Sequence, residues 1–174
     1  MHAQSSPAAD QPDGALSAAQ RRLAELIDSI DGIVWEADPV SFRFTFVSAR
    51  AERILGYAPA QWYADGFWAA HIHPDDRAWA VAYCAAQTGQ GADHAVEYRM
   101  IARDGRVVWL KDSVNVRTEQ GRPVALSGIM LDITERKRAE DELKLSSTVF
   151  ENSAQGIIIT DAGQRILKVN RSFC

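Results

Sequence analysis

Residues 94–132 decide the fold, and they read HAVEYRMIARDGRVVWLKDSVNVRTEQGRPVALSGIMLD. Apolar and polar side chains alternate through three runs of this stretch, which is the period of a half-buried strand. Asp104-Gly105 separates the first run from the second, and residues 119–122 separate the second from the third. Asp-Gly is a strong signal for the tight turn of a β-hairpin. The stretch therefore predicts three antiparallel strands joined by two turns.

A further pair of strands is predicted near the start of the chain. Residues 33–37 are mostly apolar, and an Asp38-Pro39 turn signal follows them. Beyond the turn, Phe42, Phe44 and Phe46 alternate with other residues. This pattern predicts a β-hairpin with one aromatic face.

Helices are predicted between this hairpin and the last three strands. Residues 48–71 are rich in aromatic and turn-forming residues, which favours short helices. Pro74 in a first-turn position, followed by Asp75 and Asp76, begins a longer helix that ends near Gly89. The order of two strands, helices and three further strands, with adjacent strands joined as hairpins, predicts the α+β class with antiparallel pairing.

A helix is predicted on each side of this core. Residues 16–31 form an N-terminal amphipathic helix, because a capping-box pattern begins at Ser17 and apolar residues follow at helical spacing. Residues 1–15 contain no apolar run and are expected to be a disordered tail. Residues 135–153 form a charged linker helix whose apolar positions resemble a coiled coil. We expect a homodimer through these flanking helices; a solvated helix that links two domains fits the same pattern.

Six motifs, in family order, carry a resemblance to PAS sensor domains with a PAC-type second half, over residues 32–134. They are FVS (46–48) with ILGY (54–57), HPDDR (73–77), EYR (97–99), RDG (103–105), VW (108–109) and GIMLDITER (128–136). The resemblance implies a five-stranded antiparallel sheet with short helices covering one face, a small enclosed cavity, and a signal that leaves through the helix after Thr134.

A repeat supports a second domain of the same kind. GIV at 32–34 reappears as GII at 156–158, and VS at 47–48 reappears as VN at 169–170. Residues 154–174 thus resemble the truncated start of a second PAS domain, and we expect the chain to be a piece of a longer protein.

Composition and motifs exclude several classes of function. The 174 residues carry 19 Lys and Arg against 23 Asp and Glu, and this net charge of −4 disfavours nucleic-acid binding. No run approaches the roughly 20 apolar residues of a membrane helix, so no membrane contact is expected. The two cysteines, Cys84 and Cys174, form no disulfide framework, which favours a reducing, cytoplasmic location. No phosphate loop, nucleophile elbow or zinc motif occurs, so no catalytic residue is assigned.

A ligand pocket is the main candidate site. Aromatic-lined cavities suit small organic ligands, but alternating aromatic residues on a half-buried sheet are what packing alone requires, so filling of the core is the favoured interpretation. The residues that could line the pocket are Trp35, Phe44, Phe46, Tyr98 and Trp109. No cofactor is expected; a flavin held without a covalent bond, or a haem, is the alternative.

Other candidate ligands receive structural interpretations. His71, His73, Asp75 and Asp76 could in principle hold a metal ion, but a helix start explains them and no metal is assigned. His94 could reach a haem only from a strand, and a surface position on an edge strand is expected instead. Cys84 is expected to be a small buried apolar residue.

The predicted function is sensing and signal relay. In the resembled family, the triplet Asp132-Ile133-Thr134 couples the sheet to the exit helix, and the Thr134 hydroxyl could cap that helix. The downstream output domain is expected to be of the GGDEF or EAL kind, which make and degrade cyclic di-GMP. A histidine kinase sensor, or a ligand-free dimerisation or partner-docking module, is the alternative.

Overall fold

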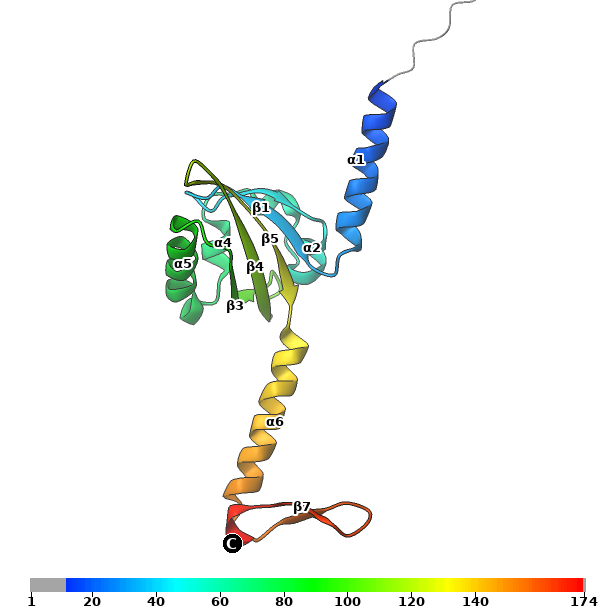
Figure 1. The fold of residues 1–174 in the computed structure, drawn as a ribbon, viewed down its shortest axis with the longest axis vertical. Coiled ribbons are helices and arrows are strands. Elements are labelled where there is room, and N and C mark those ends of the chain that lie inside the picture. Colours follow the sequence, from blue (N-terminus) through cyan, green and yellow to red (C-terminus); the bar gives the residue numbers. More distant parts are fainter. Residues whose placement is uncertain (1–11, 174) are drawn as a thin grey trace, which may run out of the picture. The chain divides into compact units, whose positions relative to one another are not determined.

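The computed structural model describes residues 12–173, which form two compact units that divide between Asp132 and Ile133. The first unit contains a five-stranded sheet in the order β2-β1-β5-β4-β3 (Figure 1). Every neighbouring pair is antiparallel. The strands are β1 (Ile33–Ala37), β2 (Phe44–Val47), β3 (His94–Ile101), β4 (Val107–Glu119) and β5 (Arg122–Asp132). The predicted α+β class and antiparallel sheet are confirmed.

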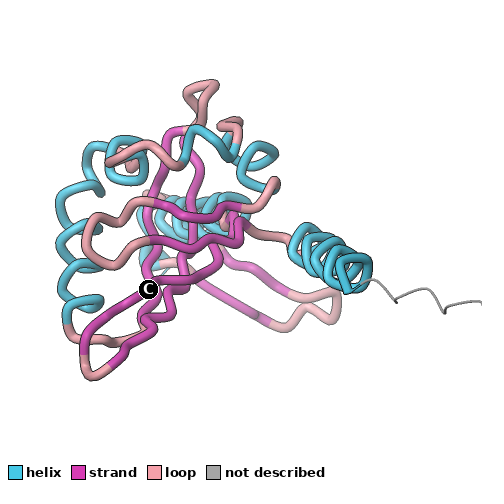
Figure 2. Tube along the Cα trace, turned by 90° about the horizontal axis from the view of Figure 1, so that it is seen from above, coloured by secondary structure: helices cyan, strands magenta, loops and turns pink. Residues whose placement is uncertain are grey.

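Four helices connect β2 to β3 and pack on one face of the sheet, here called the inner face (Figure 2). They are α2 (Arg50–Leu55), α3 (Pro59–Trp62), α4 (Phe67–His71) and α5 (Pro74–Gly89). Alternation along each strand sends every second side chain into the space beneath these helices. The inner face and the helices therefore share one hydrophobic core.

The N-terminus of α5 is fixed to the sheet by ion pairing. His73 is the N-cap, and its side chain accepts a hydrogen bond from the Asp75 backbone N–H. Asp76 is buried and accepts hydrogen bonds from the Arg99 backbone N–H (2.9 Å) and guanidinium (2.7 and 2.9 Å). These bonds from Arg99 lower the pKa of Asp76. The carboxylates at the start of this helix therefore have a structural role.

A β-bulge breaks the predicted aromatic face of the first hairpin. Glu36 pairs with Phe46, but the next residue, Ala37, pairs with Phe44, so Thr45 is extra. Residues that pair directly lie on the same face, so Phe46 joins exposed Glu36 on the outer face while Phe44 stays inside. Phe42 lies in the turn with a positive φ of 56°, and its ring packs against the core.

Helix α1 (Pro12–Ser29) begins before its predicted start at residue 16. The capping-box pattern at Ser17 therefore lies inside the helix and is not its start. Proline suits a first helical position, because the N–H that it lacks would have no partner there. The expected tail of residues 1–15 is thus helical from Pro12, and residues 1–11 lie outside the described part of the chain. No helix within residues 12–173 has both the length and the apolar character needed to cross a membrane.

The second unit consists of α6 (Thr134–Asn152), a hairpin of β6 (Ile158–Thr160) and β7 (Ile166–Val169), and a short 3₁₀ turn (Arg171–Phe173). Asn170 is buried; its side chain accepts from the Ile157 N–H at 2.7 Å and donates to the Gln155 carbonyl at 2.8 Å. The apolar strand residues are exposed, namely Ile158, Ile159, Ile166 and Leu167. This hairpin has too little structure around it to bury an apolar face.

Candidate ligand cavity

A small cavity lies between the inner face of the sheet and the helices. The centre of a water-sized sphere can move through about 20 Å³ of this cavity, which is room for one or two water molecules. Its lining comes from all five strands, the turn before β2, and helices α4 and α5: Trp35, Ala37, Phe42, Phe44, Trp68, Cys84, His94, Asp112, Val114, Leu126 and Met130. Its wall is therefore formed by residues far apart in the sequence.

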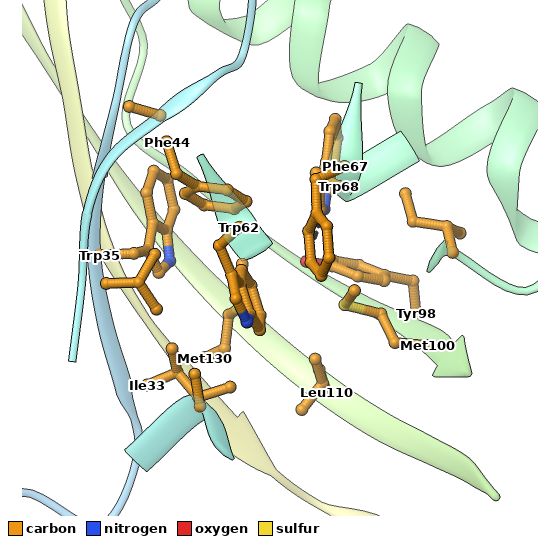
Figure 3. Packing of buried hydrophobic residues seen from close by; sticks show 14 of the residues in the cluster. Ile33, Trp35, Phe44, Trp62, Phe67, Trp68, Tyr98, Met100, Leu110 and Met130 are labelled. Carbon is orange, nitrogen blue, oxygen red and sulfur yellow. Dashed lines mark hydrogen bonds between the residues drawn. The ribbon is translucent and has the colours of Figure 1, made fainter. Parts of the chain in front are cut away.

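Aromatic rings form much of the cavity wall. Trp35 and Phe44 meet edge to face with ring centroids 5.7 Å apart, and Phe42 stacks on Trp68 at the same separation. Figure 3 shows Trp35 and Phe44 together and Trp68 beside Tyr98. Edge-to-face and stacked pairs are the preferred geometries of aromatic rings, so these side chains hold one another in place.

A chain of hydrogen bonds ends on a buried carboxylate. The Trp68 Nε1–H donates to the Tyr98 hydroxyl at 2.9 Å, and that hydroxyl donates to Asp112 Oδ2 at 3.0 Å. The Trp35 Nε1–H donates to Asp112 Oδ1 at 3.0 Å. Burial raises the pKa of Asp112 to about 7, although both hydrogen bonds favour the ionised form. Asp112 therefore changes charge near neutral pH inside the core.

Gly128 allows Trp35 to reach this carboxylate. Trp35 lies on β1 and Asp112 on β4, with β5 between them, and Gly128 is the residue of β5 that pairs with Trp35. A Cβ atom at this position would lie 2.6 Å from the Trp35 ring and 2.4 Å from the Ser113 carbonyl oxygen. A residue without a side chain is thus required where the indole crosses β5.

His94 is buried, with 9% of its surface exposed, whereas a surface position was expected. Residues of α5 cover this end of β3, and the Tyr83 ring lies 5.8 Å from the imidazole. The Nδ1 atom lies 3.0 Å from the Ala92 carbonyl oxygen, which can only accept, so Nδ1 carries the proton. In the neutral ring Nε2 is then an acceptor, and among the described residues it has no hydrogen-bond partner.

Cys84 lines the cavity from α5 as a buried thiol, in agreement with the sequence. Burial, together with the charge of Asp112, raises the pKa of Cys84 to about 12. The side chain is therefore a neutral, unreactive part of the wall.

The five predicted pocket residues do not all meet. Trp35 and Phe44 line the cavity, and Tyr98 is fully buried beside it through its bond to Asp112. Phe46 lies on the outer face because of the bulge, and half-buried Trp109 lies there too, with the Arg99 guanidinium 5.5 Å from its ring centroid. Neither residue lines this cavity; Phe46 instead lines, together with Trp35, Leu23 and Ile27, a separate pocket on the outer face.

The predicted pocket residues include only two that line this cavity, Trp35 and Phe44; among the lining residues that were missed are Phe42, Trp68, His94 and Asp112. The sequence did contain a signal for Asp112, because it alternates in phase with Val108, Leu110, Val114 and Val116, all of which are buried. A carboxylate in phase with an apolar face is a candidate for a buried functional group.

Metal and cofactor alternatives can be tested on this geometry. Within residues 12–173, no group of three or more His, Cys, Asp or Glu side chains could hold a metal ion. His71 Nδ1 instead bonds to the Phe67 carbonyl at 2.7 Å. A haem or flavin ring system far exceeds the 20 Å³ of the cavity, so the lining residues do not fit either group in this packing.

The predicted relay triplet lies where the sheet gives way to the exit helix. Asp132 is the last residue of β5 and pairs with Leu110 of β4, and Thr134 is the first residue of α6. The N-cap position belongs to Ile133, so the expectation that Thr134 caps the helix was wrong. A single residue therefore separates a cavity-lining strand from α6.

Comparisons with known proteins agree with this architecture. Residues 44–130 match the family model described as PAS fold, and residues 144–174 match one described as PAS domain. A methyl sulfide methyltransferase-associated sensor of Methanosarcina acetivorans is 33% identical over 142 residues, which are 79% of this chain and 14% of that protein. The chain thus spans only a small part of that relative.

Two solved structures extend the comparison. The N-terminal domain of a diguanylate cyclase with PAS/PAC sensor from Marinobacter aquaeolei is 34% identical with a TM-score of 0.58, covering 61% of this chain and 98% of that one. A sensory box histidine kinase/response regulator from Burkholderia thailandensis is 27% identical with a TM-score of 0.59, covering 73% of this chain and 95% of that one. Together with the sheet order and the enclosed cavity, these matches show that the chain belongs to the PAS family of sensor domains.

Proposed function

We propose that this chain is the sensing and relay part of a longer signalling protein. A change of state in the cavity shifts β5, and β5 passes the shift to α6 and then to an output domain. One observation carries this proposal. Leu126 and Met130 of β5 line the cavity, and the same strand ends at Asp132, one residue before α6.

Cyclic di-GMP turnover by GGDEF or EAL domains is the output that we favour. The diguanylate cyclase sensor domain is the more similar of the two solved structures by identity, at 34% against 27% for the histidine kinase. A histidine kinase output is the second candidate, supported by that other likeness. The free thiol of Cys84 suits a reducing, cytoplasmic location.

A homodimer is part of the proposal. Helix α6 leaves Leu145 and Val149 exposed; they are four residues apart and share one face of the helix, which pairing of two such helices would cover. A module that only dimerises, without a ligand, is the rival. Native mass spectrometry of the chain would detect the dimer. The two hypotheses differ in the output of the parent protein, because only a module that merely dimerises would have an output that is insensitive to changes in the cavity.

The test uses the full-length parent protein. Asp132→Ala should leave the domain folded and alter basal output or the response to stimulus, because the residue lies at the junction of strand and helix. Glu119→Gln, an exposed change at the far end of β4, is the matched control and should alter neither. A folded Asp132→Ala parent with unchanged output and unchanged response would contradict relay through this junction.

A further inference from the structure

We propose that the cavity binds a small alkylammonium ion with two or three non-hydrogen atoms, such as methylammonium or dimethylammonium. Its N–H groups would donate to Asp112 and to Nε2 of His94, and its methyl groups would contact the aromatic wall. The biological meaning of this site rests on the proposed sensory function, but binding itself does not.

The hydrogen-bonding groups of the cavity select for a donor. Three donors at the cavity are already used. The indole N–H groups of Trp35 and Trp68 and the hydroxyl of Tyr98 donate hydrogen bonds within the network that ends on Asp112. What remains is accepting capacity, because each carboxylate oxygen has a further lone pair and His94 Nε2 has no partner among the described residues. While Asp112 is ionised, above its pKa of about 7, an anion or a purely accepting ligand would find no strong donor on this wall.

The charge of the cavity selects for a cation. Asp112 is 2% exposed, and Arg and Lys are absent from the cavity lining. A buried carboxylate without a cationic partner is costly, so an ammonium ion beside Asp112 would supply the missing counter-charge.

The aromatic wall supports the same ligand class. Trp35, Phe42, Phe44 and Trp68 all line the space that Asp112 and His94 reach. Aromatic faces attract cations through the ring quadrupole, and methylated ammonium ions are recognised by clusters of such rings. Methyl groups would also replace water against an apolar surface.

The size of the cavity sets an upper limit on the ligand. A volume of 20 Å³ for the centre of a water-sized sphere admits two or three bonded atoms and excludes larger amines. The ceiling on binding free energy per non-hydrogen atom then implies a dissociation constant no lower than roughly 0.5 to 6 mM. An ordered water bridging Asp112 and His94 is the competing occupant.

Nuclear magnetic resonance of the 174-residue chain tests the proposal through its indole N–H signals. Methylammonium or dimethylammonium chloride, titrated at constant ionic strength, should shift the signals of Trp35 and Trp68 along one saturating curve. Exposed Trp79 and outer-face Trp109 should not move with it. Methanol, a neutral molecule of the same size, formate, an anion, and tetraethylammonium, a cation too large for the cavity, should each bind at least about tenfold more weakly.

Two variants and a control complete the test. Asp112→Asn keeps the shape and removes the charge, and His94→Phe keeps an aromatic ring at this position and removes Nε2; each should weaken binding about tenfold or more. Glu119→Gln removes an exposed charge from the same strand and should leave the affinity unchanged. If Asp112→Asn fails to fold, His94→Phe and the methanol comparison decide.

Three results would overturn the ammonium site: no saturable shift at Trp35 and Trp68 up to about 100 mM amine, equal binding of methanol, or unchanged affinity in the folded variants. None of these results bears on relay through Asp132, which is read from the output of the parent. The two proposals therefore fail separately.

Discussion

Trp35 and Asp112 are joined by a 3.0 Å hydrogen bond that crosses an intervening strand, because β5 lies between the strands that carry them. The bond spans 77 residues of sequence and links the N-terminal hairpin to the centre of the sheet. It is made possible by Gly128, over which the indole lies. The position of the Trp35 ring in the cavity wall therefore depends on Asp112 and on Gly128.

Replacing Gly128 by alanine should disrupt that arrangement. The new Cβ would lie 2.4 Å from a backbone oxygen and 2.6 Å from the Trp35 ring, so strand and indole must shift. We expect a loss of about 1 to 3 kcal/mol in the free energy of unfolding, measured by urea denaturation. Gly89→Ala is the control: at the end of α5 its Cβ meets nothing within 4 Å, and stability should stay equal or rise. Equal stability of the two variants would show that β5 accommodates a side chain.

The raised pKa of Asp112 should make folding depend on pH. Its folded pKa is about 7 against 3.8 for the free residue, so between these values the folded state holds a proton that the unfolded state has lost. Its contribution to the free energy of unfolding is full below about pH 3.8 and is lost as the pH rises to about 7, by an amount on the order of 4 kcal/mol. The measurement is the unfolding free energy of wild type minus that of Asp112→Asn at pH 5 and pH 8. This difference should be smaller at pH 8 than at pH 5, because ionised Asp112 destabilises the wild type. An equal difference at both pH values would contradict the titration of Asp112.

Replacing Asp76 should destabilise the protein far more than replacing its neighbour Asp75. Asp76 is 6% exposed and bonded to Arg99, whereas the Asp75 side chain is 71% exposed. Asp76→Asn should cost about 2 to 4 kcal/mol, because it leaves the Arg99 guanidinium without its main partner, and Asp75→Asn less than about 0.5 kcal/mol. Because the pKa of Asp76 is lowered, its contribution is present above pH 3.8 and is lost on further acidification. Thermal unfolding of both variants provides the comparison, and equal costs would show that the pair is not structural.

Much of the fold, but less of the site, could be predicted from the sequence. Asp104-Gly105 and the alternation around Leu126 determine the last three strands by local chemistry, and the structure confirms them. Phe46 was misplaced because one extra residue, Thr45, reverses the alternation, and bulges leave no clear mark in a single sequence. The burial of His94 depends on how α5 packs over β3, which is a tertiary contact.

Alanine substitutions of Trp109 and Trp62 should differ in their cost to stability, because Trp109 lies on the outer face and Trp62 lies in the core. Trp109 is half-buried with its ring under Arg99, whereas Trp62 is fully buried against Phe44 and Phe67. Trp62→Ala should cost about 3 to 5 kcal/mol, and Trp109→Ala only about 1 to 2 kcal/mol. Denaturant titration of both variants measures the difference. A cost for Trp109 as large as that for Trp62 would place its ring in a core contact.

Hydrogen exchange at the start of α6 is the most direct measurement of transmission from the cavity. Asp112→Asn alters the cavity without changing any residue of α6, and Glu119→Gln on the same strand serves as the control. If β5 couples the cavity to the helix, amide protection at residues 134–140 should change by about threefold or more in Asp112→Asn and stay constant in Glu119→Gln. Unchanged protection at these residues, in an Asp112→Asn chain whose Trp35 and Trp68 signals have moved, would contradict signal relay from the cavity to the exit helix.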